Sequence, residues 1–230
     1  MTRQSTGLLP SDLGPGGFMA AFEDSRETLA RLEVYADRLR TWQSKINLVA
    51  PATVPLVWQR HFADSAQILD LAPEGAKRWV DLGSGAGFPG LVLATQLAGR
   101  GLEGARMVLV ESDTRKCAFL SEVVRATGLA SLVAVDIVNA RIEDPATRGR
   151  IGLAEVVTSR ALAPLDRLLA LARPLFEPTT VGLFLKGRGV DEELAVAEKR
   201  WRFTAELVPS LTDAEGRVVV VRSLAGKTEG

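Results

Sequence analysis

Reactive side chains are scarce in this chain of 230 residues, which contains one cysteine and one histidine. A single thiol, Cys117, excludes an internal disulfide and a cysteine-rich zinc site, and it is typical of proteins from reducing compartments. Cys117 is also more typical of a buried core residue than of a nucleophile, because His61 is remote from it in the sequence. We therefore expect a cytoplasmic protein without a metal site.

Strong net charge and long hydrophobic runs are also missing. Lys plus Arg balance Asp plus Glu at 28 each, so any contact with nucleic acid has to come from a local basic patch. No apolar run reaches the roughly 18 residues that a membrane span needs, and the N-terminus lacks a signal-peptide pattern. With 47% hydrophobic residues, the chain is expected to form a soluble, monomeric globular protein without membrane contact.

The first part of the chain is expected to be helical behind a loose N-terminal end. Residues 1–21 contain several glycines and prolines with little apolar periodicity, which predicts a flexible tail that ends near Phe22. Apolar residues then recur at spacings of three and four from Leu29 to Ile46, and a proline restarts the chain before a second helix. The pattern predicts an N-terminal helical region over residues 22–76.

From residue 77 onward, short apolar runs alternate with helical patterns. Such runs of valine and leucine are typical of buried parallel strands in a doubly wound sheet. Two extended segments, 202–208 and 217–223, predict an antiparallel hairpin at the sheet edge. We expect residues 77–230 to form an α/β core with a mostly parallel sheet, packed with the helical region into one compact unit. The expected strands are 78–82, 106–111, 131–138, 154–159 and 180–186, and the expected helices are 89–98, 114–127, 164–173 and 190–199.

A glycine-rich segment, VDLGSGAGFPG at 80–90, follows from the first expected strand into the first helix of this core. In an open parallel sheet this loop usually holds a ligand beyond the carboxyl ends of the strands. Gly85, Gly87 and Gly90 satisfy the GxGxxG pattern, and Glu111 ends the second strand, where an acid binds ribose hydroxyls. Taken alone, the pattern fits dinucleotides and other adenosine ligands alike.

Asp81 distinguishes between these ligands by its charge. A dinucleotide places its anionic pyrophosphate over this loop and the following helix N-terminus, so a carboxylate there repels the ligand. S-adenosylmethionine has no phosphate and carries an ammonium and a sulfonium, which an acidic loop favours. The comparison favours S-adenosylmethionine, with Asp81, Gly83 and Gly85 among its expected contacts. The alternative is that Asp81 caps a turn and Glu111 is a surface acid.

Several short strings give the chain a more specific likeness. They are NLVAP (47–51), RHFADS (60–65), VDLGSGAGFPG (80–90), ESDTRKCAFL (111–120), ARIED (140–144) and VTSRAL (157–162). In this order and over about residues 22–222, they resemble the RsmG (GidB) family of bacterial 16S ribosomal RNA methyltransferases. The resemblance implies the Rossmann-like fold of class I S-adenosylmethionine-dependent methyltransferases. It also implies methylation of guanine N7 in a loop of the small-subunit RNA.

The resemblance carries site residues over by their place in the motifs. Cofactor contacts are implied at Gly83, Phe88, Glu111, Ile142, Glu143 and Arg160. Ile142 departs from the alanine that relatives often have there, which changes the shape of the pocket but leaves a backbone contact to the adenine in place. Our own interpretation of Arg160 is that it binds a cofactor carboxylate or stacks on a base, and the alternative is a strand-end arginine paired to an acid.

Guanine N7 carries a lone pair and no proton, so its methylation needs orientation of the reactants rather than a general base. A chain with one histidine is adequate for this chemistry. We therefore expect Arg160, His61 and Arg60 to orient the guanine or contact RNA, with Asp64 orienting His61, although a packing role for His61 is the simpler interpretation. Further RNA contacts are expected from basic residues near the same rim, namely Lys186, Arg188, Arg115 and Lys116. The alternative for Lys186 and Arg188 is a solvated turn between glycines.

Other functions fit parts of the sequence. The literal GxGxxG pattern is compatible with an NAD(P)-dependent oxidoreductase, against which Asp81 argues. A non-catalytic RNA-binding or ribosome-assembly factor with a methyltransferase fold is a second alternative, and a small-molecule methyltransferase is a third. The leading hypothesis is an rRNA (guanine-N7)-methyltransferase that acts on 16S ribosomal RNA or the small ribosomal subunit.

Overall fold

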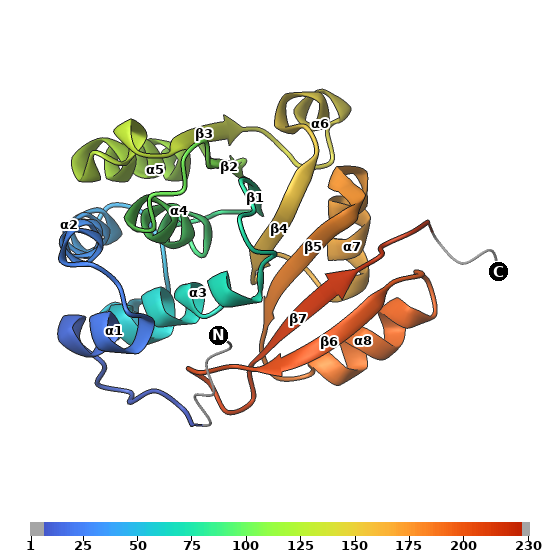
Figure 1. Cartoon of the computed structure of the whole chain (residues 1–230), viewed down its shortest axis with the longest axis horizontal. Helices are drawn as coiled ribbons and strands as arrows, with labels where there is room; N and C mark the ends of the chain where they lie inside the picture. The colour runs from blue at the N-terminus through green and yellow to red at the C-terminus, as the bar shows by residue number, and fades with distance from the viewer. Residues whose placement is uncertain (1–6, 227–230) are drawn as a thin grey trace.

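A seven-stranded sheet forms the centre of the computed structural model, which describes residues 7–226 (Figure 1). The strands are β1 (Arg78–Leu82), β2 (Arg106–Glu111), β3 (Ala134–Asn139), β4 (Ala154–Arg160), β5 (Phe176–Lys186), β6 (Thr204–Pro209) and β7 (Arg217–Arg222). Their spatial order is β3-β2-β1-β4-β5-β7-β6. Strands β1 to β5 are mutually parallel, and β7 pairs antiparallel with both β5 and β6. The predicted fold class, including the C-terminal antiparallel hairpin, is confirmed.

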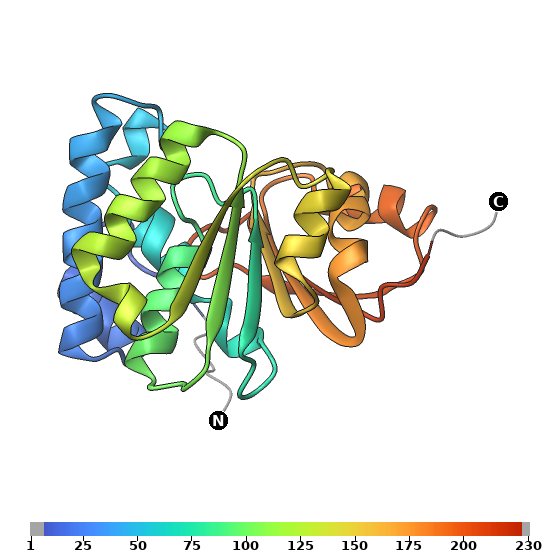
Figure 2. The ribbon, with the colours of Figure 1, turned by 90° about the horizontal axis from the view of Figure 1, so that it is seen from above.

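Helices cover both faces of this sheet and make three layers (Figure 2). One face packs against α1, α2, α4 and α5, and the other packs against α6, α7 and α8, each with its own hydrophobic cluster. The N-terminal helices share the first cluster with α4 and α5, through residues such as Leu32, Phe62 and Phe119. The helix bounds are α1 (Pro15–Phe22), α2 (Arg26–Gln43), α3 (Asp64–Ala66), α4 (Gly90–Gly99), α5 (Thr114–Thr127), α6 (Pro145–Ile151), α7 (Leu165–Ala172) and α8 (Val190–Glu198).

Most expected elements of the core are present, and several keep their expected bounds. Strands 78–82 and 106–111 and helix 114–127 coincide with β1, β2 and α5. The strand expected over 131–138 begins later, at Ala134, because Leu129–Ser131 form a 3₁₀ turn first. Helix α6 was not predicted, although Asp144 and Pro145 are a typical helix start: the Asp144 carboxylate accepts a hydrogen bond from Ala146 N.

The N-terminal end differs from the expected tail. Helix α1 begins at Pro15, and Phe18 is fully buried against Trp58 and Phe62. Leu9 N also donates a hydrogen bond to Leu211 O near the other end of the chain. The prediction that order begins near Phe22 is therefore wrong for these residues. Phe18 belongs to no apolar repeat in the sequence, yet Trp58 and Phe62 from a later segment bury its side chain. Residues 1–6 of the expected tail lie outside the described residues, and the boundary at residue 77 stays a prediction.

The second expected helix is divided into three short helical pieces. A π-helical turn over Trp58–Ala63 leads into α3, and a 3₁₀ turn over Leu69–Leu71 follows. A π-helical turn is rare and is frequently found at functional sites. It places His61 and Asp64 of the RHFADS string on the side of the molecule where β1 and β4 end.

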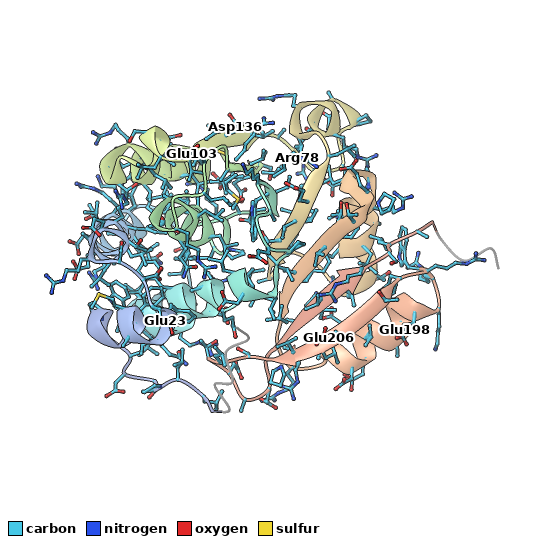
Figure 3. The ribbon with its side chains drawn as sticks, in the orientation of Figure 1. Glu23, Arg78, Glu103, Asp136, Glu198 and Glu206 are labelled. Carbon is cyan, nitrogen blue, oxygen red and sulfur yellow. The ribbon has the colours of Figure 1, made fainter. Side chains whose placement is uncertain are left out.

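Both edge strands of the sheet carry charged side chains at their surfaces. Figure 3 labels Asp136 on β3 and Glu206 on β6, and these acids pair with Arg106 and Arg222 at 2.5 and 3.6 Å. Charges on exposed edges discourage pairing with another sheet. Among the described residues, no helix combines the length and hydropathy that crossing a membrane requires.

Candidate functional site

A cavity of about 460 Å³ lies beyond the carboxyl ends of β1, β2 and β4, where an open parallel sheet usually binds its ligand. Its wall contains the glycine-rich loop, the end of β2, the turn after β3 and the segment after β4. The predicted residues that line it are Gly83, Gly85, Phe88, Glu111, Ile142, Glu143, Arg160 and Lys116. The structure thus brings together all predicted cofactor residues except Asp81. We call this space the donor cavity.

The glycine-rich loop has a backbone that side chains would disturb. Gly83 has a φ of +69°, and a Cβ built there would lie 2.6 Å from Leu162 Cδ1. The Gly83 N–H donates to Val110 O at 2.9 Å, which ties the loop to β2. From α2, the Tyr35 hydroxyl donates to Ala86 O, and burial raises the pKa of Tyr35 well above its ordinary value. The sole tyrosine of the chain therefore fixes the loop as a neutral donor.

Asp81 lies beneath the loop and does not line the donor cavity. Its carboxylate is fully buried, accepts a hydrogen bond from Thr158 Oγ1 at 2.9 Å and accepts another from Gly90 N at 3.3 Å. Burial raises the pKa of Asp81 to about 6, against the lowering effect of these hydrogen bonds. The predicted direct contact between Asp81 and the cofactor is therefore wrong, because Asp81 faces its neighbour Thr158 across the β1–β4 ladder. Asp81 holds the start of α4 against β4.

Glu111 reaches the donor cavity from the end of β2. Its Oε2 accepts a hydrogen bond from Gly85 N at 2.9 Å, and its Oε1 accepts one from Asp113 N at 2.8 Å. These contacts fix the carboxylate between the glycine loop and the start of α5. Each carboxylate oxygen can accept a second hydrogen bond, so Glu111 can still receive the hydroxyls of a ribose.

Arg160 is clamped at the carboxyl end of β4 by three acceptors. Its Nη1 donates to Asp64 Oδ2 at 3.2 Å and to the carbonyl of Arg60 at 3.1 Å, and its Nη2 donates to His61 Nδ1 at 2.9 Å. The guanidinium carbon also lies 4.9 Å from the centre of the Phe88 ring. Arg160 is thus paired to an acid, as its alternative interpretation held, and it lines the cavity as well.

His61 has both ring nitrogens engaged by protein atoms. Because a guanidinium only donates, Nδ1 accepts from Arg160, so Nε2 carries the proton and donates to Thr53 Oγ1 at 2.8 Å. Burial and the neighbouring cations Arg160 and Arg60 lower the pKa of His61 to about 3. The ring also stacks on Phe88 at 4.8 Å. The prediction that His61 contacts guanine is not supported, and neither is its orientation by Asp64, which binds Arg160 instead.

A second cavity of about 670 Å³ adjoins the first, and we call it the acceptor cavity. Both cavities share a wall made of Leu48, Val49 and residues 160–163. Ala161 in this wall has a φ of +53°, a strained conformation for a residue with a side chain. The remaining walls come from the π-helical segment, the end of β5, α8 and the β6–β7 turn, and they include Arg60, His61, Lys186 and Glu193.

The residues predicted to bind RNA divide into two kinds. Lys186 is 9% exposed, and its Nζ donates to Ala163 O at 2.5 Å and pairs with Glu193 Oε2 at 2.7 Å. It therefore anchors the shared wall, and the prediction that it is an open RNA contact is wrong. Arg188 and Arg115 are exposed side chains paired to Glu215 and Asp113, while Lys116 lines the donor cavity. Arg60 lines the acceptor cavity and pairs with Asp213 at 3.1 Å.

Sequence reasoning missed several residues that position the site. Thr158 holds Asp81, Tyr35 holds the loop, and Thr212 donates to Asp64 Oδ1 at 2.8 Å. Thr158 stands in the TSRA string, which was a usable signal. Thr212 and Tyr35 lie far from their partners in the sequence and carried no signal.

The residues around the donor cavity fit S-adenosylmethionine. Glu111 offers a fixed carboxylate for ribose hydroxyls, and Ile142 and Leu171 offer apolar surface for the adenine. Lys116 and Arg160 are among the cationic side chains that line the cavity. Within residues 7–226, no three His, Cys, Asp or Glu side chains gather closely enough to hold a metal ion.

Comparisons with known proteins show the fold and the family of the chain. A "TehB-like SAM-dependent methyltransferase" from Corynebacterium glutamicum has a similar fold, with a TM-score of 0.51 and 18% identity over 84% of this chain and 98% of that one. "Ribosomal RNA small subunit methyltransferase G" from Parvibaculum lavamentivorans is 50% identical over 98% of this chain and 96% of its own length. The protein of the same name from Methylorubrum populi is 53% identical over 87% of this chain and 91% of its own length. The family model described as "rRNA small subunit methyltransferase G" matches residues 28–219, so the chain belongs to the GidB family.

Proposed function

We propose that this protein transfers a methyl group from S-adenosylmethionine to N7 of a guanine in 16S ribosomal RNA. Membership of a family described as rRNA small subunit methyltransferase G supports the reaction and the RNA. The cofactor supplies an electrophilic methyl group on a sulfonium. The N7 lone pair forms the new bond to carbon while the carbon–sulfur bond breaks, and the sulfur keeps the electron pair.

The side chains at the junction of the two cavities favour guanine N7 as the methyl acceptor. Among the described residues, Arg160 is the single ionisable side chain that lines both cavities. An arginine cannot accept a proton at ordinary pH, and the His61 beside it has a pKa of about 3 and both nitrogens engaged. A wall of this kind suits an acceptor atom that attacks without losing a proton. Exocyclic amines and ribose hydroxyls lose one, whereas guanine N7 does not.

We assign the binding of the cofactor to the donor cavity. Glu111 accepts the ribose hydroxyls, and Gly83 and Gly85 bring backbone close to the methionine end. Ile142 and Glu143 border the adenine, and Phe88 packs beneath Arg160. Arg160 orients the reactants at the junction, since its three acceptors leave it little rotational freedom.

The partner of this enzyme is 16S rRNA or the small ribosomal subunit. Ribosomes are cytoplasmic in bacteria, from which we infer a cytoplasmic site of action. Independence from metal and a monomeric state remain predictions. The comparisons do not favour an oxidoreductase or a non-catalytic assembly factor, because the chain matches methyltransferases over nearly its whole length.

Mass-spectrometric mapping of modified nucleosides tests this proposal. The purified protein, labelled cofactor and unmodified small-subunit RNA, naked or assembled, are incubated together and the RNA is digested. We expect the label in N7-methylguanosine at one nucleotide. Label in an exocyclic amine or a ribose would disprove N7, and a protein that binds the cofactor but labels neither RNA form would disprove the substrate.

A further inference from the structure

Glu193 at the start of α8 is a carboxylate with one engaged oxygen and one free oxygen. Its Oε2 forms an ion pair with Lys186 Nζ at 2.7 Å and accepts a hydrogen bond from Leu165 N at 2.7 Å. Within residues 7–226, its Oε1 has no hydrogen-bond partner. The side chain lines the acceptor cavity and not the donor cavity. Glu193 is therefore held in place while half of its acceptor capacity stays available.

In the other two carboxylates of the acceptor cavity, both oxygens already have a donor. Asp64 accepts from Thr212 and Gln67 at one oxygen and from Arg160 at the other. Asp213 accepts from Glu215 N at one oxygen and from Arg60 at the other. Among the described acids lining this cavity, Glu193 alone keeps an oxygen without a donor. Glu193 is therefore the acid best able to accept hydrogen bonds from a ligand in this cavity.

Guanine brings hydrogen-bond donors on its Watson–Crick edge, whereas its reacting atom N7 lies on the Hoogsteen edge. When N7 faces the donor cavity, the adjoining Watson–Crick edge, with its N1–H and 2-amino group, is turned toward the acceptor cavity. Both groups are donors, and a charged acceptor makes the stronger hydrogen bonds to them. Adenine presents the lone pair of its N1 at the same edge, which a carboxylate repels. A carboxylate placed there therefore selects guanine over adenine.

We propose that Glu193 is a specificity-determining residue whose Oε1 accepts hydrogen bonds from the N1–H and 2-amino group of the target guanine. The inference rests on the proposed function and extends it to recognition of the base. Lys186 and Leu165 N hold the other oxygen, so the carboxylate is preorganised before RNA binds. Lys186 also donates a hydrogen bond to Ala163 O in the shared wall. The same lysine thus links Glu193 to the junction of the two cavities.

Exchange of the target guanine for inosine, which lacks only the 2-amino group, tests this role. The guanine identified by mapping is replaced in a ligated 16S rRNA, and kcat/KM is measured for both RNAs. We expect the wild-type protein to prefer guanine about tenfold, the effect of one hydrogen bond to a charged group. Equal rates on both RNAs would overturn the assignment without any variant being made. If neither RNA is methylated, the proposed function itself fails.

Two variants separate recognition from structure. In Glu193→Gln, the preference for guanine over inosine should fall to within about twofold, because the amide keeps the size of the side chain but loses its charge. In Lys186→Met, the ion pair is lost but Leu165 N still holds Glu193, so both rates should fall while the preference for guanine narrows less than in Glu193→Gln. A Glu193→Gln protein that keeps the full preference would show that Glu193 has only a structural role.

Discussion

The donor and acceptor cavities share a wall but are built in different ways. The donor cavity is built around one continuous loop, Gly83 to Phe88, to which the ends of β2, β3 and β4 add further residues. The acceptor cavity is formed by side chains from segments as far apart as Thr53 and Arg217. Its polar groups are held by contacts between segments, such as Arg160 with Asp64. The difference implies that substitutions on the donor side act mainly through backbone shape, and those on the acceptor side act through broken charge networks.

Arg160 belongs to both cavities, so its loss should have the largest effect. In Arg160→Met, Asp64 and His61 lose their donor and the junction loses its cation. We expect kcat/KM for RNA to fall by a factor of about a hundred to a thousand, or roughly 3–4 kcal/mol. Steady-state methylation of small-subunit RNA measures this.

The matched control is Arg200→Met, which removes an exposed arginine paired with Asp166 outside both cavities. It should retain nearly full activity. An Arg160→Met protein that is folded and methylates RNA at the wild-type rate would contradict the central place of Arg160.

The buried carboxyl of Asp81, which lies beneath the glycine-rich loop, makes the stability of the protein depend on pH. Because its folded pKa of about 6 lies above the ordinary value of 3.8, the protonated form is favoured in the folded state. The stability from this preference is present below pH 3.8 and is lost as the pH rises to about 6, by at most about 3 kcal/mol. Asp81→Asn removes this pH dependence. The free energy of unfolding of the variant, relative to that of wild type, should therefore be higher at pH 7 than at pH 4.

Urea denaturation at both pH values, with Asp136→Asn as the exposed control, measures the difference. Asp136 lies on an edge strand with its side chain in solvent. A difference between Asp81→Asn and wild type that does not vary with pH would contradict the shifted pKa.

Gly83 tests the shape of the donor side. Gly83→Ala places a methyl group against Leu162 and puts a side chain at positive φ, whereas Gly128→Ala creates the same backbone strain with no atom within 4 Å. We expect affinity for S-adenosylmethionine to fall about tenfold in Gly83→Ala and to stay unchanged in Gly128→Ala. Calorimetric titration gives both affinities, and similar values for the two variants would show that the contact with Leu162 is unimportant.

Thr212 tests the outer part of the acceptor network, where the smallest effect is expected. Thr212→Val removes the hydroxyl that donates to Asp64, which in turn binds Arg160. We expect kcat for RNA methylation to fall about fivefold, the effect of one hydrogen bond, with cofactor affinity unchanged. Thr212→Ser should restore the rate, and a failure of this rescue would mean that packing, rather than the hydroxyl, is responsible.

Local patterns predicted much of the fold and of the donor cavity. Strand β1 and the loop after it are contiguous, so the glycine spacing and the position of Glu111 predicted residues that do line the cavity. The role of Asp81 was mistaken because burial depends on what covers a side chain, here Thr158 on a neighbouring strand. Lys186 was mistaken for the same reason, since α8 folds back and supplies Glu193 as its partner.

The sequence by itself determined the alternation of strands and helices, the glycine-rich loop and the family to which the chain belongs. These features depend on periodicity and on residues within one segment, where chemistry and spacing suffice. Only the tertiary structure decided that His61 is neutral and bound to Arg160, that Phe18 is buried in the core, and that Glu193 keeps a free oxygen. The charge of a side chain, its burial and its remaining hydrogen-bond capacity depend on neighbours that are distant in the sequence. Only packing brings those neighbours together.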